Sequence, residues 1–178
     1  MDRTIAVFGA SRSLKGDPHF EEAVLCGQLL ARAGFAVATG GYAGTMEAVS
    51  QGARLAGGHV IGVTAPDVFP GRIGANEHVA EERKARSIVE RMGLLIEEVD
   101  GAIALWGSLG TATELLVAWN IAYVAPFSGG TRMPIVAVGE PWISIVPNLE
   151  ESLGTDTGIV TVADSVSEAV QHMATALG

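Results

Sequence analysis

Residues 36–64, AVATGGYAGTMEAVSQGARLAGGHVIGVT, contain one complete β-α-β unit. The apolar runs 36–39 and 59–64 are strand candidates, and the amphipathic run 44–56 between them is a helix candidate. The pair Gly57-Gly58 ends this helix, at the position where a left-handed backbone is needed. Because two strands joined by a helical crossover pair in parallel with a right-handed connection, the stretch predicts a parallel sheet.

The same alternation of strand and helix continues through the rest of the chain. Further strand candidates are residues 4–9, 101–105, 134–138 and 159–162, and further helix candidates are residues 18–33, 81–98, 111–124, 142–152 and 165–177. The strand candidates are apolar nearly throughout, which is typical of strands covered on both faces. We therefore predict an α/β fold with a doubly wound, mostly parallel sheet flanked by helices, the Rossmann-like arrangement, in a single domain over residues 1–178.

One long irregular stretch, residues 65–80, follows the carboxyl end of a predicted strand. Doubly wound folds bind their ligands at the carboxyl ends of the strands, and loops of this length are usually functional or mobile. We expect this loop to lie near a binding site.

Composition limits the classes of partner. The 178 residues are 48% hydrophobic and 17% charged, which is enough for a substantial core and excludes disorder. A net charge of -9 argues against nucleic acid or an anionic membrane as the main partner. The lone Cys26 excludes an intramolecular disulfide framework, and neither a signal peptide nor a long apolar span is visible. We expect a soluble, cytoplasmic protein.

Several common cofactor sites are missing from the sequence. The turn at residues 9–13, GASRS, lacks the G-x-G-x-x-G fingerprint of dinucleotide sites, and the second strand candidate does not end in an acidic residue. Gly44 is followed by Thr45, whereas a P-loop needs lysine there. The four histidines are scattered and only one cysteine is present, which argues against zinc. We expect neither a cofactor nor a metal.

Two glycine-rich turns each join a strand candidate to a helix candidate: TGGYAGTME at residues 39–47 and WGSLGTATE at residues 106–114. Glycine allows a ligand to touch backbone N–H groups, and the following helix offers the positive end of its dipole to a phosphate. Tight turns of this kind need glycine in any case, but two of them together favour anion binding.

The residues around both turns resemble the LONELY GUY family, whose members are often labelled lysine decarboxylase-like. Residues 40–63 are similar to its first signature, and the second turn is similar to its P-G-G-x-G-T-x-x-E signature. The resemblance extends from Ile5 to about Val138. It implies a site for a nucleoside 5′-monophosphate, whose N-glycosidic bond active members hydrolyse to free base and ribose 5-phosphate.

The resemblance also implies roles for individual residues. Glu114 is the expected catalytic carboxylate, and Gly110 and Thr111 are expected to hold the phosphate. The full set of candidate substrate- and phosphate-binding residues is Gly9, Ser11, Gly40, Gly41, Gly44, Thr45, Met46, Gly107, Ser108, Gly110 and Thr111.

The second turn departs from the family signature at two positions. Trp106 replaces a proline and Ser108 replaces a glycine, and the Ser108 side chain could narrow the approach of a phosphate or donate a hydrogen bond to it. Molybdenum cofactor carrier proteins resemble this sequence too. A carrier or sensor that binds a nucleotide-like or pterin-like ligand without cleaving it is therefore the alternative function.

The family pairs its glutamate with an arginine from an upstream E-R-K segment. Glu82-Arg83-Lys84 matches those letters but lies 23 residues before Trp106, whereas Arg91 lies 15 residues before it. One helix and one strand fix the distance between the two elements, and that spacing favours Arg91 over Arg83 as the partner of Glu114.

Two of these features also have a structural interpretation. Thr111-x-x-Glu114 fits a capping box, in which the glutamate closes the amino terminus of a helix. The four cations between residues 83 and 91 could attract a phosphate, or they could form a solvated face together with the neighbouring glutamates.

The helix candidate at residues 111–124 is apolar on all sides, with Glu114 as its only charge. Such a helix must be buried on more than one side. We predict a two-fold homodimer through this helix and its neighbour at residues 81–98, which the resemblance also implies.

Overall fold

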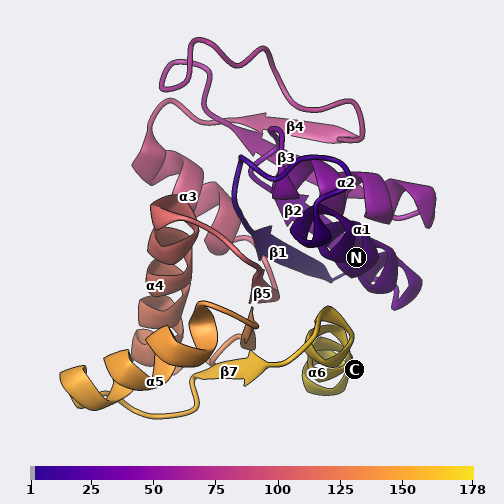
Figure 1. Cartoon of the computed structure of the whole chain (residues 1–178). Helices are drawn as coiled ribbons and strands as arrows, with labels where there is room; N and C mark the ends of the chain where they lie inside the picture. Colours follow the sequence, from indigo (N-terminus) through magenta and orange to yellow (C-terminus); the bar gives the residue numbers. More distant parts are fainter. Residues whose placement is uncertain (1–2) are drawn as a thin grey trace.

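Seven parallel strands form one sheet in the order β4-β3-β2-β1-β5-β6-β7 in the computed structural model, which describes residues 3–178 (Figure 1). The strands are β1 (Thr4–Phe8), β2 (Ala36–Thr39), β3 (Val60–Thr64), β4 (Glu81–Lys84), β5 (Gly101–Ala104), β6 (Ile135–Val138) and β7 (Val160–Ala163). The chain runs from β1 outward to β4 and then returns to the other side of β1 with β5, so the strand order reverses between β1 and β5. The predicted doubly wound, Rossmann-like sheet is confirmed.

Within the described residues 3–178, six α-helices cover the two faces of this sheet, and a short 3-10 helix, η1 (Ala125–Ser128), follows α4. The α-helices are α1 (Pro18–Arg32), α2 (Thr45–Leu55), α3 (Ile88–Ile96), α4 (Leu109–Val124), α5 (Trp142–Leu153) and α6 (Val166–Leu177). One face carries α1, α2 and α6, and the other carries α3, α4 and α5 (Figure 1). None of the helices in residues 3–178 combines the length and apolarity needed to cross a bilayer.

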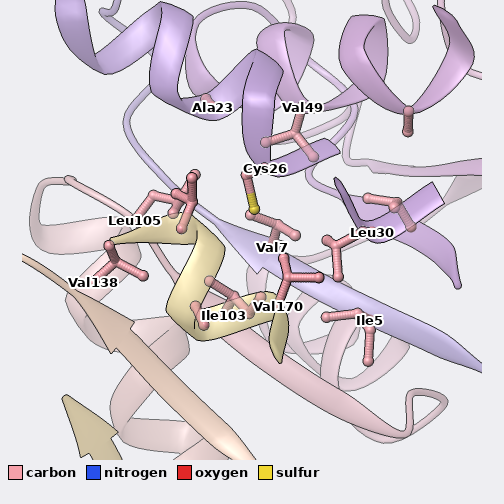
Figure 2. Close-up of a cluster of buried hydrophobic side chains, with 14 of the residues drawn as sticks. Ile5, Val7, Ala23, Cys26, Leu30, Val49, Ile103, Leu105, Val138 and Val170 are labelled. Carbon is pink, nitrogen blue, oxygen red and sulfur yellow. The ribbon is translucent and has the colours of Figure 1, made fainter. Parts of the chain in front are cut away.

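The central strands are apolar throughout because each packs against both layers. Ile5 and Val7 of β1 join the cluster under α1, α2 and α6, whereas Ala6 and Phe8 join the cluster on the opposite face. Figure 2 shows the first cluster, in which the Cys26 side chain of α1 points toward β1 near Val7. The carboxyl ends of these buried strands are thereby fixed in position, which is where the polar residues of a site must be held.

The predicted helix at residues 81–98 is wrong in its first half. Residues Glu81–Lys84 form the edge strand β4, which pairs with β3, and α3 begins only at Ile88 after the N-cap Ser87. Ser87 Oγ accepts a hydrogen bond from the Glu90 N–H at 3.1 Å. The edge of β3 needs backbone hydrogen-bond partners, and an edge strand tolerates charged side chains. Pairing with β3 therefore overrides the helical propensity of residues 81–84.

Residues 65–80 contain neither helix nor strand, as predicted, and are tied to the first glycine turn. The Asn76 backbone N–H donates to the Gly41 carbonyl at 2.7 Å, and its side-chain amide donates to the Gly41 and Tyr42 carbonyls at 3.1 and 3.0 Å. The Ala65 N–H donates to the Tyr42 hydroxyl at 2.7 Å. The loop is therefore held against the turn that follows β2.

Candidate functional site

A cavity of about 130 Å³ lies where the strand order reverses, at the carboxyl end of β1 and the start of α4. Five separate segments line it: the end of β1 and its turn, the first glycine turn with α2, the 65–80 loop, α3, and the second glycine turn with α4. The lining residues are Val7, Phe8, Gly9, Ser11, Gly40, Met46, Phe69, Arg72, Arg91, Ser108, Gly110, Thr111 and Glu114. This is the position where doubly wound folds bind ligands.

An ion pair between Arg91 of α3 and Glu114 of α4 lies in the lining of the cavity. Arg91 Nη1 lies 3.4 Å from Glu114 Oε1, and the two side chains are only 11% and 13% exposed. Arg91 also donates from Nε to the Val63 carbonyl at 2.8 Å and from Nη2 to the Gly40 carbonyl at 2.9 Å. Because the planar guanidinium has all its donors in one fork, these acceptors fix its orientation and hold the carboxylate in place.

The two charges of the pair respond differently to burial. Burial raises the pKa of the Glu114 carboxyl to about 7, while the positive charge of Arg91 opposes that rise. Burial lowers the pKa of the Arg91 guanidinium, and Glu114 opposes this change. Arginine remains a cation at working pH, so Glu114 is the member of the pair that can exchange a proton near neutrality.

Glu114 does not cap α4, so the capping-box interpretation is wrong. The helix begins at Leu109 after the N-cap Ser108, which makes Glu114 its sixth residue and places it in the second turn. The N–H groups of Leu109, Gly110 and Thr111 bond to no acceptor in the described part of the chain. The amino terminus of α4 is therefore open to an anion, one helical turn away from the Glu114 carboxylate.

The structure divides the predicted binding residues into two groups. Seven of them line the cavity: Gly9, Ser11, Gly40, Met46, Ser108, Gly110 and Thr111. The other four lie outside its lining, where they serve packing instead: Gly41, Gly44, Thr45 and Gly107. A Cβ on Gly44 would collide with the Ala10–Ser11 backbone, and the Thr45 N–H already donates to the Ala10 carbonyl at 2.8 Å. The first glycine turn thus mainly lets segments pack closely, while the second leaves N–H groups available.

Gly40 and Gly110 provide a matched pair of substitutions that separates these two roles. A Cβ on Gly40 would collide with the Arg91 guanidinium, whereas in the described chain nothing lies within 4 Å of a Cβ on Gly110. We expect Gly40→Ala to lower the free energy of unfolding by about 1–3 kcal/mol, as overpacking does, and Gly110→Ala to leave it nearly unchanged. Chemical denaturation measures both, and equal losses would contradict the packing role of Gly40.

The four cations between residues 83 and 91 do not form one phosphate site. Arg83 pairs with Glu81 at 2.7 Å and with Glu98 at 2.6 Å. Lys84 lies 3.7 Å from Glu82, and of the four only Arg91 lines the cavity. The solvated-face interpretation holds for the other three, and the structure places Arg91, not Arg83, beside Glu114.

Four residues that line the cavity were not among the sequence candidates: Val7, Phe8, Phe69 and Arg72. Val7 and Phe8 belong to the predicted strand that leads to the site, and Phe69 and Arg72 belong to the long loop. The position of that loop after β3 indicated that it lies near a binding site. Nothing in its sequence indicates which of its side chains line the cavity.

Comparisons with known proteins give a consistent family. The model of the SLOG cluster4 family matches residues 2–170. A probable cytokinin riboside 5′-monophosphate phosphoribohydrolase of Oryza sativa subsp. japonica is 37% identical over 120 residues, which are 66% of this chain and 52% of that protein. The cytokinin riboside 5′-monophosphate phosphoribohydrolase of Mycobacterium tuberculosis is 32% identical over 142 residues, covering 79% of this chain and 72% of the relative. The chain spans about half the length of the rice relatives.

Solved structures share the fold along the whole chain. The molybdenum cofactor binding protein from Rippkaea orientalis superposes with a TM-score of 0.79 at 22% identity, over 100% of this chain and 99% of the other. The molybdenum cofactor carrier protein from Chlamydomonas reinhardtii gives a TM-score of 0.72 at 24% identity, over 99% of each chain. At these identities the likeness establishes the common architecture.

Proposed function

Because this chain belongs to the SLOG cluster4 family, in the LONELY GUY group of Rossmann-like proteins, we propose that it is a nucleoside 5′-monophosphate phosphoribohydrolase. The reaction is hydrolysis of the N-glycosidic bond, which releases a free base and ribose 5-phosphate. The observation that carries the proposal is the buried Glu114 carboxylate, held by Arg91 at 3.4 Å and placed one turn along α4 from unoccupied N–H groups.

The geometry suits this chemistry because one helix positions both ends of a ribose 5-phosphate. The 5′-phosphate binds at the amino terminus of α4, beside Gly110 and Thr111. Glu114 follows Gly110 by four positions along the helix, a rise of about 6 Å, which supports a position for C1′ of the ribose beside the carboxylate.

Breaking the bond builds positive charge on C1′ and the ring oxygen. The Glu114 carboxylate stabilises this oxocarbenium-like species or takes a proton from the attacking water. Arg91 is not a base, because its guanidinium stays protonated at working pH. Its role is to orient Glu114 and to favour the ionised carboxylate, an effect that opposes the burial of that group.

Assay of free base with a panel of nucleoside 5′-monophosphates tests the proposal directly. Release of base from at least one member supports hydrolysis, and thermal shift with the same panel detects binding without turnover. Stabilisation without release would instead support the second candidate, a carrier or sensor of a nucleotide-like or pterin-like ligand. That alternative is favoured by Ser108, which lines the cavity at a position where the family signature has glycine.

Hydrolysis should increase with pH and level off above about pH 7, the pKa of the Glu114 carboxyl. The reaction uses the ionised form, which exists above this pKa and is lost as the pH falls through it. The pH profile of kcat/KM reports the pKa of the free protein, so it is the appropriate measurement. A profile without an inflection near neutrality would contradict the assigned role of the carboxylate.

We also propose that the chain forms a homodimer through α3 and α4. These helices lie side by side on one face of the sheet, and α4 leaves Leu116 45% and Leu109 83% exposed (Figure 1). On α3, Val89 is 74% exposed. A groove of about 430 Å³ follows the outer side of α4, and burial of this apolar surface favours association.

Light scattering should give the mass of a dimer at micromolar concentration. Leu116→Glu places a charge in the middle of the α4 surface and should shift the mass to that of a monomer without unfolding the chain. A monomeric unmodified protein would contradict the dimer.

A further inference from the structure

A second hollow, of about 290 Å³, adjoins the cavity that contains Glu114. The two share Ser11 and Arg72 in their linings, and the second continues past Tyr42, Ile73 and Asn76. Its lining includes no residue of α4 or of the second glycine turn. The second hollow therefore extends from the site on the side of the first glycine turn and the 65–80 loop.

Arg72 stands at the junction of the two hollows with its donors free. Its guanidinium lies over the rings of Phe69 and Tyr42, with the Cζ atom 4.5 and 4.7 Å from the ring centres. Within residues 3–178 the Arg72 guanidinium forms no salt bridge and donates no hydrogen bond, although the chain carries a net charge of -9. Stacking on two rings holds a planar guanidinium in place and leaves its N–H edge available to a ligand.

The size of the two spaces indicates how a nucleotide would occupy them. The Glu114 cavity alone is smaller than the about 300–1,000 Å³ typical of ligand sites, and the two hollows together fall within that range. With the phosphate at α4 and the ribose beside Glu114, the base must extend past Arg72 into the second hollow. Arg72 would then face the base and not the phosphate.

We propose that the second hollow is the base subsite and that Arg72 is a catalytic residue that stabilises the departing base. This inference rests on the proposed hydrolase function. When the C1′–N bond breaks, its electron pair stays on the base nitrogen, and the water oxygen forms the new bond to C1′ while Glu114 accepts the water proton. The base is anionic until a proton from solvent or from Glu114 neutralises it. The Arg72 guanidinium donates hydrogen bonds to that anion and keeps its own proton.

Binding measurements show which part of the ligand Arg72 touches. We expect Arg72→Gln to weaken a nucleoside 5′-monophosphate by about tenfold in isothermal calorimetry, the loss typical of a charged hydrogen bond, and to leave ribose 5-phosphate within about twofold. Arg54→Gln, at the exposed end of α2, is the matched control and should change neither. An equal loss of affinity for both ligands would make Arg72 a phosphate ligand and overturn the base subsite. Failure of the unmodified protein to bind either ligand would also overturn the base subsite.

A second arm of the experiment varies the leaving group. With a nucleotide as substrate, Arg72→Gln should lower kcat by at least about 100-fold, whereas with 4-nitrophenyl β-D-ribofuranoside 5-phosphate the loss should be about threefold or less. Nitrophenolate is a stable anion and needs little stabilisation by Arg72. A larger loss of kcat on the nucleotide than on the nitrophenyl substrate therefore identifies leaving-group stabilisation. Arg72→Lys, which retains the charge, should recover part of the nucleotide rate.

The two arms separate the inference from the function it rests on. Equal loss on both substrates, or no loss on either, would overturn the role of Arg72 while the hydrolase function stands. If the unmodified protein cleaves neither substrate, the hydrolase function fails and the catalytic role of Arg72 with it. In that case the calorimetry still decides whether the second hollow receives the base.

Discussion

We expect Glu114→Gln to lower the turnover of nucleoside 5′-monophosphate hydrolysis by at least about 100-fold and to leave nucleotide binding intact. Glutamine has the same shape and still accepts a hydrogen bond from Arg91, but it has no negative charge to stabilise the oxocarbenium-like state and cannot take a proton from water. The proposed phosphate contacts at Gly110 and Thr111 do not involve the Glu114 side chain, so affinity should stay within a few fold. Steady-state kinetics and calorimetry measure the two effects separately.

A matched control distinguishes the loss of this carboxylate from a general change of charge. Glu97→Gln removes one negative charge from an exposed position at the end of α3 and should leave turnover unchanged. Near-full hydrolysis by Glu114→Gln would show that Glu114 is not the catalytic carboxylate. The chemistry would then have to come from another group in the cavity.

Arg91→Ala is expected to lower both turnover and stability. It leaves Glu114 buried without its partner and removes the donors to the Val63 and Gly40 carbonyls. Breaking a buried ion pair in this way typically costs about 3–5 kcal/mol of folding free energy. The pKa of Glu114 should also rise, because Arg91 no longer opposes the effect of burial, and the carboxyl then takes up a proton at neutral pH.

Arg83→Ala is the comparison that tests the choice of arginine. Arg83 is 30% exposed in its side chain and pairs with two surface glutamates, and such pairs are worth about 0–1 kcal/mol. We expect a small loss of stability and nearly normal turnover. Chemical denaturation gives the first quantity, and kinetics on the folded fraction gives the second. If Arg83→Ala abolished hydrolysis and Arg91→Ala did not, the ion pair between Arg91 and Glu114 would not be needed for catalysis.

The local pattern of the chain was enough to predict most of the architecture. The six predicted strands match β1, β2, β3, β5, β6 and β7 to within one residue at each end, and the 65–80 loop was located correctly. This is possible because the hydrophobic period of each segment and the glycines at its ends act over a few residues. The spacing of 15 residues from Arg91 to Trp106 also carried information, since one helix and one strand fix the distance it spans.

What the sequence by itself determined is therefore the layered α/β fold and the two glycine turns at the ends of strands. The resemblance to the LONELY GUY family added Glu114 as a candidate group, and the spacing along the chain favoured Arg91 as its partner. Only the tertiary structure decided that residues Glu81–Lys84 form a strand, because that outcome depends on the free edge of β3 and not on local propensity. It also decided that Gly40 makes room for Arg91, that Gly110 is open, and that Arg72 turns inward from the loop. Each of these outcomes depends on contacts between segments far apart in the chain. The conformational preferences of single residues do not specify which distant segments come into contact.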